Sequence, residues 1–157
     1  MSNTFIPYRI FPAGPDKAPL ISGWQEKATA NQVQIEEWRD QGVRAWGIPT
    51  GERNGLFVID LDVNKRTGSK DGELTLKQID AYAHLLGSIN VRTPSGGAHI
   101  YLKHFDGARN SHGKIGPSID TRGEGGYVIA PGSVTDGGTY EGAFPVLKPV
   151  PFGLRAM

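Results

Sequence analysis

The segment at residues 56–63, with the sequence LFVIDLDV, constrains the fold of this chain more than any other. It is apolar and rich in β-branched residues, and the turn pair Asn54-Gly55 precedes it, so it predicts a buried strand. Asp60 and Asp62 interrupt the apolar pattern. Because residues i and i+2 of a strand point to the same face, both carboxylates are expected to project from one side of a sheet.

Two neighbouring carboxylates on a buried strand are unfavourable, because each loses solvation and the two charges repel. A divalent cation relieves both effects, and carboxylate oxygens without soft ligands suit Mg²⁺ or Mn²⁺. The same pattern also fits two exposed acids at the end of a strand, next to Asn64 and Lys65. An Asp-x-Asp pair alone therefore leaves both interpretations open.

The composition narrows the class of protein. The chain has 157 residues, enough for one domain with a substantial core. It contains no cysteine, which excludes disulfides, thiolate zinc sites, iron–sulfur clusters and cysteine nucleophiles. The net charge of +1 says nothing about nucleic acid. We find no apolar run of the roughly 20 residues that a membrane span needs, and no signal-peptide pattern, so we expect a cytoplasmic protein without a membrane partner.

The remaining periodicity predicts two helices among short strands. One helix is expected at 31–41, where Asn31 is the N-cap, and the other at 72–86, where Gly87 ends it. The expected strands, besides 56–63, are 5–11, 45–49, 89–92, 99–105, 119–122, 127–130 and a short one at 139–141.

The connections between these elements complete the prediction of the fold. Loops rich in glycine and proline are expected at 12–23 and between 105 and 119, and the segment 149–152 resembles the start of a linker. A few strands, two helices and then mostly strands favour a single α+β domain over residues 1–157. We expect a largely antiparallel sheet with flanking helices rather than a doubly wound fold.

A second candidate for chemistry is the segment 95–101, SGGAHIY. Gly96 and Gly97 permit positive φ and close approach of backbone amides to an anion, and Ser95 adds a hydroxyl donor. His99 opens the following strand and can donate to a phosphate oxygen. The alternative is an ordinary tight hairpin with a histidine at its edge.

A third candidate is the segment 119–127, IDTRGEGGY. Asp120 and Arg122 lie two residues apart on one predicted strand, so they share a face. An acid that holds a metal beside an arginine that holds triphosphate oxygens is a plausible pairing. A simple surface ion pair between the two residues is the alternative.

Together the three segments indicate one type of reaction more specifically than any one of them does. Three acids and two triphosphate-binding candidates, His99 and Arg122, fit two-metal nucleotidyl transfer. In that reaction a primer 3′-hydroxyl attacks in line, and pyrophosphate leaves.

The same motifs resemble a known family, the bifunctional DNA primase/polymerase (prim-pol) domain of the archaeo-eukaryotic primase superfamily. The resemblance is carried by the Asp-x-Asp strand, by SGGAHIY at 95–101 and by IDTRGEGGYVIAPGS at 119–133. Upstream, WGIPTG at 46–51 and the segment that begins at Lys17 also match. Motif order and spacing agree over roughly residues 17–133. Prim-pol domains occur in plasmid, phage and integrated-element replication proteins.

The resemblance implies a fold and a set of site residues. The fold is an RRM-like primase catalytic core. The implied metal ligands, for Mg²⁺ or Mn²⁺ and not zinc, are Asp60, Asp62 and Asp120. The implied nucleotide-binding residues are His99, Ser95, Gly96, Gly97 and Arg122, with Lys17, Thr50 and Gly51 as further pocket residues.

The resemblance also implies substrates and partners. They are a single-stranded DNA template with its primer, dNTP or NTP, and a helicase or helical accessory domain in a longer replication protein. Some members carry Glu at the position of Asp62. The aspartate here has a shorter side chain than glutamate, but its carboxylate is chemically equivalent. Because relatives continue into accessory and helicase regions, we expect template-dependent extension rather than de novo priming.

Two other functions remain open at this point. A non-catalytic RRM-like module could bind single-stranded nucleic acid by stacking bases on Tyr101, Phe105 and Tyr127. Three retained acids argue against it, because carboxylates repel phosphate unless a metal neutralises them. A phosphodiester hydrolase could use His104 or His112 as a base, but no motif supports it.

Overall fold

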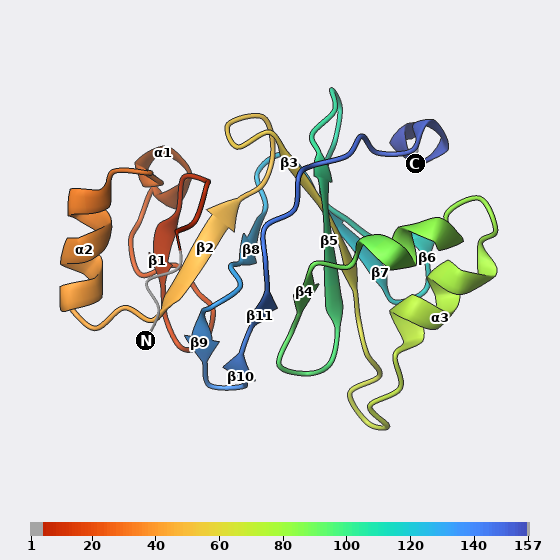
Figure 1. Ribbon diagram of the computed structural model, residues 1–157, viewed down its shortest axis with the longest axis horizontal. Coiled ribbons are helices and arrows are strands. Elements are labelled where there is room, and N and C mark those ends of the chain that lie inside the picture. The colour runs from red at the N-terminus through yellow and green to blue at the C-terminus, as the bar shows by residue number, and fades with distance from the viewer. Residues whose placement is uncertain (1–4, 157) are drawn as a thin grey trace.

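The computed structural model describes residues 5–156, in which short strands predominate (Figure 1). The helices are α1 (Trp24–Lys27), α2 (Gln32–Asp40), α3 (Asp71–Gln78) and the 3₁₀ helices η1 (Ala83–Ser88) and η2 (Phe152–Ala156). The strands are β1 (Phe11–Ala13), β2 (Ala45–Pro49), β3 (Leu56–Leu61), β4 (Val91–Arg92), β5 (Ala98–Lys103), β6 (Ser111–Gly116), β7 (Ile119–Arg122), β8 (Tyr127–Ile129), β9 (Val134–Thr135), β10 (Gly138–Thr139) and β11 (Glu141–Gly142).

The strands form three sheets, and every pairing between named strands is antiparallel. The six-stranded sheet has the order β11-β4-β5-β3-β7-β6, and the three-stranded sheet has the order β1-β2-β8. In Figure 1, α1 and α2 lie beyond the three-stranded sheet, and α3 lies beyond the six-stranded sheet. The predicted α+β class with a mainly antiparallel sheet is confirmed, and it is consistent with a primase-like core.

Strand β3 is central in the six-stranded sheet and alternates between two apolar clusters. Leu56 and Val58 pack into the cluster that joins the two larger sheets, whereas Phe57 and Ile59 pack into the cluster beneath α3 and η1. All four side chains are buried, and each such burial contributes about 1.5–3 kcal/mol. Asp60 shares the face of Val58, at the point where that face opens into a groove.

Helix α2 begins as the sequence predicts. The Asn31 side chain accepts hydrogen bonds from the backbone N–H groups of Val33 and Gln34, as an N-cap does. Gly42, with φ of 96°, follows the helix and provides its left-handed end. Trp38 and Ile35 on this helix pack against the three-stranded sheet through the apolar cluster.

The predicted continuous helix at 72–86 is wrong in its second half. Helix α3 ends at Gln78, Ile79 is extended with φ of −96° and ψ of 91°, and η1 follows. On one continuous helix Leu76 and Leu85 would point about half a turn apart. The break lets both leucines enter the same buried cluster against the sheet.

Two loop and strand predictions are also corrected. The first strand was expected at 5–11, but β1 spans Phe11–Ala13, because its partner β2 meets it there in the register Phe11↔Gly47. The stretch between 105 and 119 was expected as a loop, yet it contains β6, the edge strand beside β7. Strand β6 has the sequence SHGKIG, whose exposed polar residues give no apolar alternation.

The C-terminal predictions differ from the structure in two places. The strand expected at 139–141 is divided between β10, which pairs with β9, and β11, which pairs with β4. Tyr140 lies at this change of sheet. The segment 149–152 does not start a linker, because Val150 and Leu154 are buried in the cluster beneath the six-stranded sheet.

Candidate active site

Three acids meet at one end of the central strands. Asp60 on β3 is directly opposite Asp120 on β7, and ligand atoms of Asp60, Asp62 and Asp120 all lie within 4.8 Å of one another. Asp62 follows β3 and is held by its main chain. Its N–H donates to the Ser118 carbonyl and its carbonyl accepts from the Gly72 N–H, both at 2.9 Å. The pairing of β3 with β5 and β7 and the main-chain hydrogen bonds of Asp62 therefore hold the three acids in place.

The acids are poorly solvated for carboxylates. Burial raises the pKa of Asp60 to about 6, with Asp120 adding to the rise and with Arg122 and Lys17 opposing it. Burial, together with the charges of Asp60 and Asp120, raises the pKa of Asp62 to about 6. Asp60 and Asp62 thus hold their protons more tightly than they would in water, mainly because burial removes the water that solvates the charged form.

His99 on β5 is opposite Asp60 on the other side of β3. Its Nε2 atom is 3.6 Å from Asp60 Oδ1, beyond hydrogen-bonding distance, and the residue is only 5% exposed. Burial, with Arg122 and Lys17, lowers the pKa of His99 to about 4, so the ring is neutral at pH 7. Its buried Nδ1 atom has no hydrogen-bond partner within residues 5–156.

Two cationic or polar groups flank the acids. Arg122 Nη2 lies 3.8 Å from carboxylate oxygens of both Asp60 and Asp120, so one guanidinium faces the two acids. On the edge strand β6, Nδ1 of the exposed His112 lies 3.2 Å from Asp120 Oδ2. The sequence suggested His112 only as a hydrolase base, because β6 gave no sign of pairing with the acid-bearing strand.

The acids lie in a groove made of two adjoining pockets of about 680 and 430 Å³. Five residues line both pockets, and they are Lys17, Asp60, His99, Arg122 and Tyr140. Residues of the first pocket lie on the side of the 93–95 turn and the β9–β10 hairpin. Residues of the second lie on the side of α1 and β8.

Lys17 enters this groove from the loop after β1, as the sequence analysis anticipated. Its backbone has φ of 74°, a conformation that non-glycine residues rarely adopt. The hydroxyl of Tyr127 on β8 donates a 2.8 Å hydrogen bond to the Lys17 carbonyl. This bond ties the strained loop to the three-stranded sheet.

The remaining sequence candidates lie at different distances from the groove. Ser95 lines the first pocket. The Gly96 N–H donates to the Thr93 carbonyl within the turn, and a Cβ at Gly97 would lie 2.8 Å from the Leu61 carbonyl oxygen. Close backbone approach at Gly97 is therefore made to the neighbouring strand.

Thr50 and Gly51 lie outside both pockets. The buried Thr50 hydroxyl donates to the Gly123 carbonyl at 2.6 Å. Gly51, with φ of 110°, packs against the Glu124 side chain. Their nucleotide-binding role stays a prediction, and the contacts seen connect β2 to the loop after β7.

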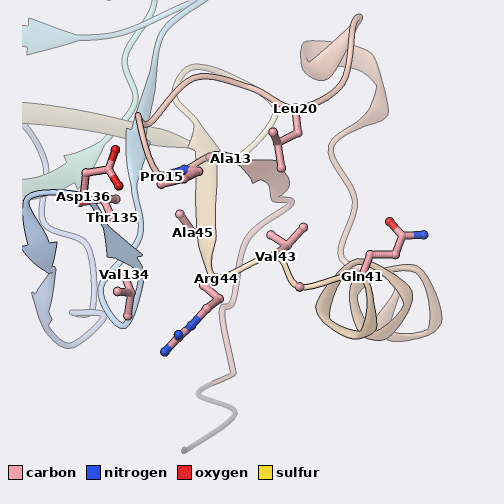
Figure 2. A pocket seen from close by; sticks show the side chains of 11 residues that line it. Ala13, Pro15, Leu20, Gln41, Val43, Arg44, Ala45, Val134, Thr135 and Asp136 are labelled. Atoms are coloured by element: carbon pink, nitrogen blue, oxygen red, sulfur yellow. The ribbon is translucent and has the colours of Figure 1, made fainter.

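A third, more apolar pocket of about 330 Å³ lies beyond the first (Figure 2). Asp136 N–H donates to the Pro15 carbonyl at 2.9 Å, and both residues line this pocket as well as the first one. Leu20 and Val43 line its other side. None of the three clustered acids lines it, so the chemistry is concentrated in the groove.

The family profile described as bifunctional DNA primase/polymerase, N-terminal, matches residues 6–151. The chain belongs to this family. The match includes every residue of the groove, so the acid cluster lies within the prim-pol domain. None of the curated proteins matches the chain.

Family membership gives the site its general meaning. Prim-pol enzymes are nucleotidyltransferases that use divalent metals and act on DNA and nucleotides, and this prim-pol domain has a matching acidic cluster. No helix within residues 5–156 is both long and apolar enough to cross a bilayer.

Trp24 and Tyr140 also line the groove, a role that the sequence did not predict. Both are aromatic residues outside the three motifs, and their place depends on how β8 and the β10–β11 segment fold back toward the acids. The upstream motif that begins at Lys17 was the one sequence signal that the segment around Trp24 belongs to the site.

Proposed function

We propose that this domain is a template-dependent DNA polymerase and primase that transfers a nucleotide from a (d)NTP to a 3′-hydroxyl and releases pyrophosphate. The observation that carries the proposal is the cluster of Asp60, Asp62 and Asp120 in an open groove of a prim-pol domain. Phosphoryl transfer needs mainly positioning and charge stabilisation, which such a groove can provide.

The acids suit divalent cations of the Mg²⁺ or Mn²⁺ type, and we propose a two-metal site. Three carboxylates without sulfur or paired histidine ligands are a hard, oxygen-rich donor set. Burial raises the pKa of Asp60 and Asp62, so a bound cation would offset the solvation that these two carboxylates lose. Bound metals would lower the pKa of the attacking hydroxyl and neutralise charge on the triphosphate.

Cationic side chains of the groove are proposed to bind the triphosphate. Arg122 faces the acids and offers a planar donor group that matches phosphate oxygens. Lys17 adds a second cation from the opposite wall. Electrostatic attraction to these groups would orient the nucleotide before transfer.

Neutral donors are proposed to complete phosphate binding. The His99 ring is uncharged at pH 7, so its N–H group donates without adding a cation to a site that metals occupy. Ser95 lines the same pocket and offers a hydroxyl. Neutral donors of this kind stabilise developing charge at fixed positions.

The stacking surface of the alternative binding module has little support. Tyr101 is only 2% exposed within the core that joins the two larger sheets. Phe105 packs edge-on against Phe57, and the Arg155 guanidinium lies over its ring. These two aromatics are engaged inside the protein and do not form an open platform for bases.

Primer extension tests the proposal. Wild-type protein, Asp60→Asn and Asp120→Asn are given a primed single-stranded template with Mg²⁺ or Mn²⁺ and dNTPs. Both variants are expected to lose about 10³-fold in rate, because metal stabilisation is worth several kcal/mol. Asp106→Asn, at an exposed position after β5 and outside the groove, is the matched control.

The interpretation needs folded variants. Circular dichroism and thermal unfolding of both variants are expected to match wild type or exceed it, since Asn removes charge repulsion. Wild-type extension rates in either folded variant would overturn the proposal. Unprimed synthesis with dNTPs and NTPs supplied separately tests de novo priming. The helicase partner and the mobile-element origin stay predictions.

A further inference from the structure

We propose that Tyr140 selects the sugar of the incoming nucleotide, with its aromatic ring excluding a 2′-hydroxyl so that deoxynucleotides are favoured. The inference rests on the polymerase function proposed above and assigns specificity to a residue outside the three sequence motifs.

The position of Tyr140 is the first argument. It is one of the five residues that line both pockets of the groove, together with Lys17, Asp60, His99 and Arg122. The other four are charged groups or a buried imidazole suited to phosphate and metal. Tyr140 alone offers an aromatic hydrocarbon surface at the junction of the pockets.

The chemistry of transfer places the sugar at this junction. The reacting phosphorus of a nucleotide must lie at the acid cluster, and only O5′ and C5′ separate that phosphorus from the sugar ring. The sugar must therefore lie beside residues that border the acids. With the phosphates on the cationic side chains, our proposal orients the sugar so that its 2′ position faces Tyr140.

The main chain holds Tyr140 rigidly. Its N–H donates to the Ser133 carbonyl at 3.0 Å, and its carbonyl accepts from the Gly132 N–H at 2.7 Å. The residue lies between β10 and β11, which belong to different sheets, so both of its flanks are paired.

The ring of Tyr140 is packed as firmly as its main chain. The residue is 6% exposed, and its ring centroid lies 6.2 Å from that of His99 in a tilted arrangement. A close-packed ring has no room to move aside for one additional oxygen atom. A 2′-hydroxyl at this position would overlap the ring, whereas a 2′-hydrogen would contact it.

The test compares sugars within single preparations. Single-nucleotide incorporation is measured on a primed template with a dNTP and with its matching NTP, for wild type, Tyr140→Leu and Tyr140→Phe. Tyr82→Leu is the matched control, because Tyr82 packs in the cluster on the other face of the six-stranded sheet. The readout is the NTP to dNTP ratio of kcat/KM, in which any inactive fraction cancels.

We expect Tyr140→Leu to raise this ratio at least about 10-fold, since a pocket that loses its steric contact discriminates weakly. Tyr140→Phe keeps the ring and is expected to stay within about twofold of wild type, as is Tyr82→Leu. Should Tyr140→Leu fail to fold, Tyr140→Met, whose unbranched and flexible side chain adapts better to an irregular gap, carries the same expectation.

Four results would overturn the assignment. They are an unchanged ratio in the folded Leu or Met variant, an equal change in Tyr140→Phe, an equal change in the Tyr82→Leu control, and a wild-type preference for NTP. A wild-type protein that incorporates neither nucleotide would instead refute the polymerase function, and the sugar assignment with it.

Discussion

The two larger sheets contribute different kinds of group to one groove. The six-stranded sheet and its adjoining loop supply the three acids, together with His99 and Arg122. The three-stranded sheet and its connections supply main chain, aromatic rings and the charged side chains of Asp16 and Lys17. The clustered acids therefore come from one wall of the groove, and the other wall mainly gives shape.

This division predicts opposite consequences for substitutions on the two walls. The six-stranded wall accumulates like charges at the cost of stability, so removing one of its acids is expected to reduce activity and to leave or improve stability. The three-stranded wall is close-packed, so changes there are expected to reduce stability first. The following predictions test that contrast.

After the acids themselves, the largest effect is expected at Arg122. Replacing it as Arg122→Gln removes the cation that faces both Asp60 and Asp120. We expect kcat/KM for dNTP to fall by about 100-fold or more, the usual effect of losing one electrostatic donor. Steady-state primer extension measures the loss, and Arg109→Gln, an exposed residue outside the groove, is the control. An unchanged kcat/KM in Arg122→Gln would show that Arg122 does not bind the triphosphate.

On the other wall, Gly47→Ala is expected to destabilise the fold. A Cβ at Gly47 would overlap the buried Phe11 ring, and the contact joins β2 to β1. Overpacking of a core typically costs about 1–3 kcal/mol, and we expect an overlap this severe to cost about 3 kcal/mol. Urea unfolding measures the change, and Gly87→Ala, with open space at its Cβ position, is the matched control. Equal stability of the two variants would contradict a close-packed wall.

The third prediction concerns pH and the acid cluster. The pKa of Asp60 is about 6 in the folded protein, above its ordinary value of 3.8. The folded state thus binds this proton more tightly than the unfolded state, so ionisation destabilises the metal-free protein as pH rises from about 4 through 6. Asp60→Asn is expected to gain about 2 kcal/mol at pH 8 and almost nothing at pH 4.

Urea unfolding in EDTA at both pH values measures this gain. Adding Mg²⁺ is expected to stabilise wild type at pH 8 much more than Asp60→Asn, because the cation relieves the same repulsion. A variant that is less stable than wild type at pH 8 would show that Asp60 is favourably paired in the metal-free protein.

The smallest effect is expected at Tyr127. Tyr127→Phe removes the hydrogen bond to the Lys17 carbonyl and leaves the ring in place. We expect KM for dNTP to rise about threefold with little change in kcat, the effect of losing one neutral hydrogen bond. Tyr8→Phe, a matched loss of a tyrosine hydroxyl from the same apolar cluster, is the control. Equal KM values in the two variants would show that the position of the Lys17 loop does not affect nucleotide binding.

The same contrast explains what the sequence could predict. Strands β3, β5 and β7 were foreseen because their apolar residues are local and continuous, and register then brought Asp60, Asp120 and His99 together. Strand β1 was misplaced and edge strand β6 was missed, because strands with Pro, Gly or polar residues are defined by distant partners. Tyr140 escaped notice for the same reason.

The antiparallel register around β3 has a consequence for folding fidelity. A slip of one residue in either ladder would turn His99 or Asp120 to the opposite face, into the apolar cluster beneath α3. Burying a charge or an imidazole there would prevent folding rather than yield a defective enzyme. Folded molecules should therefore all be competent, so specific activity per folded molecule should stay constant while a preparation ages.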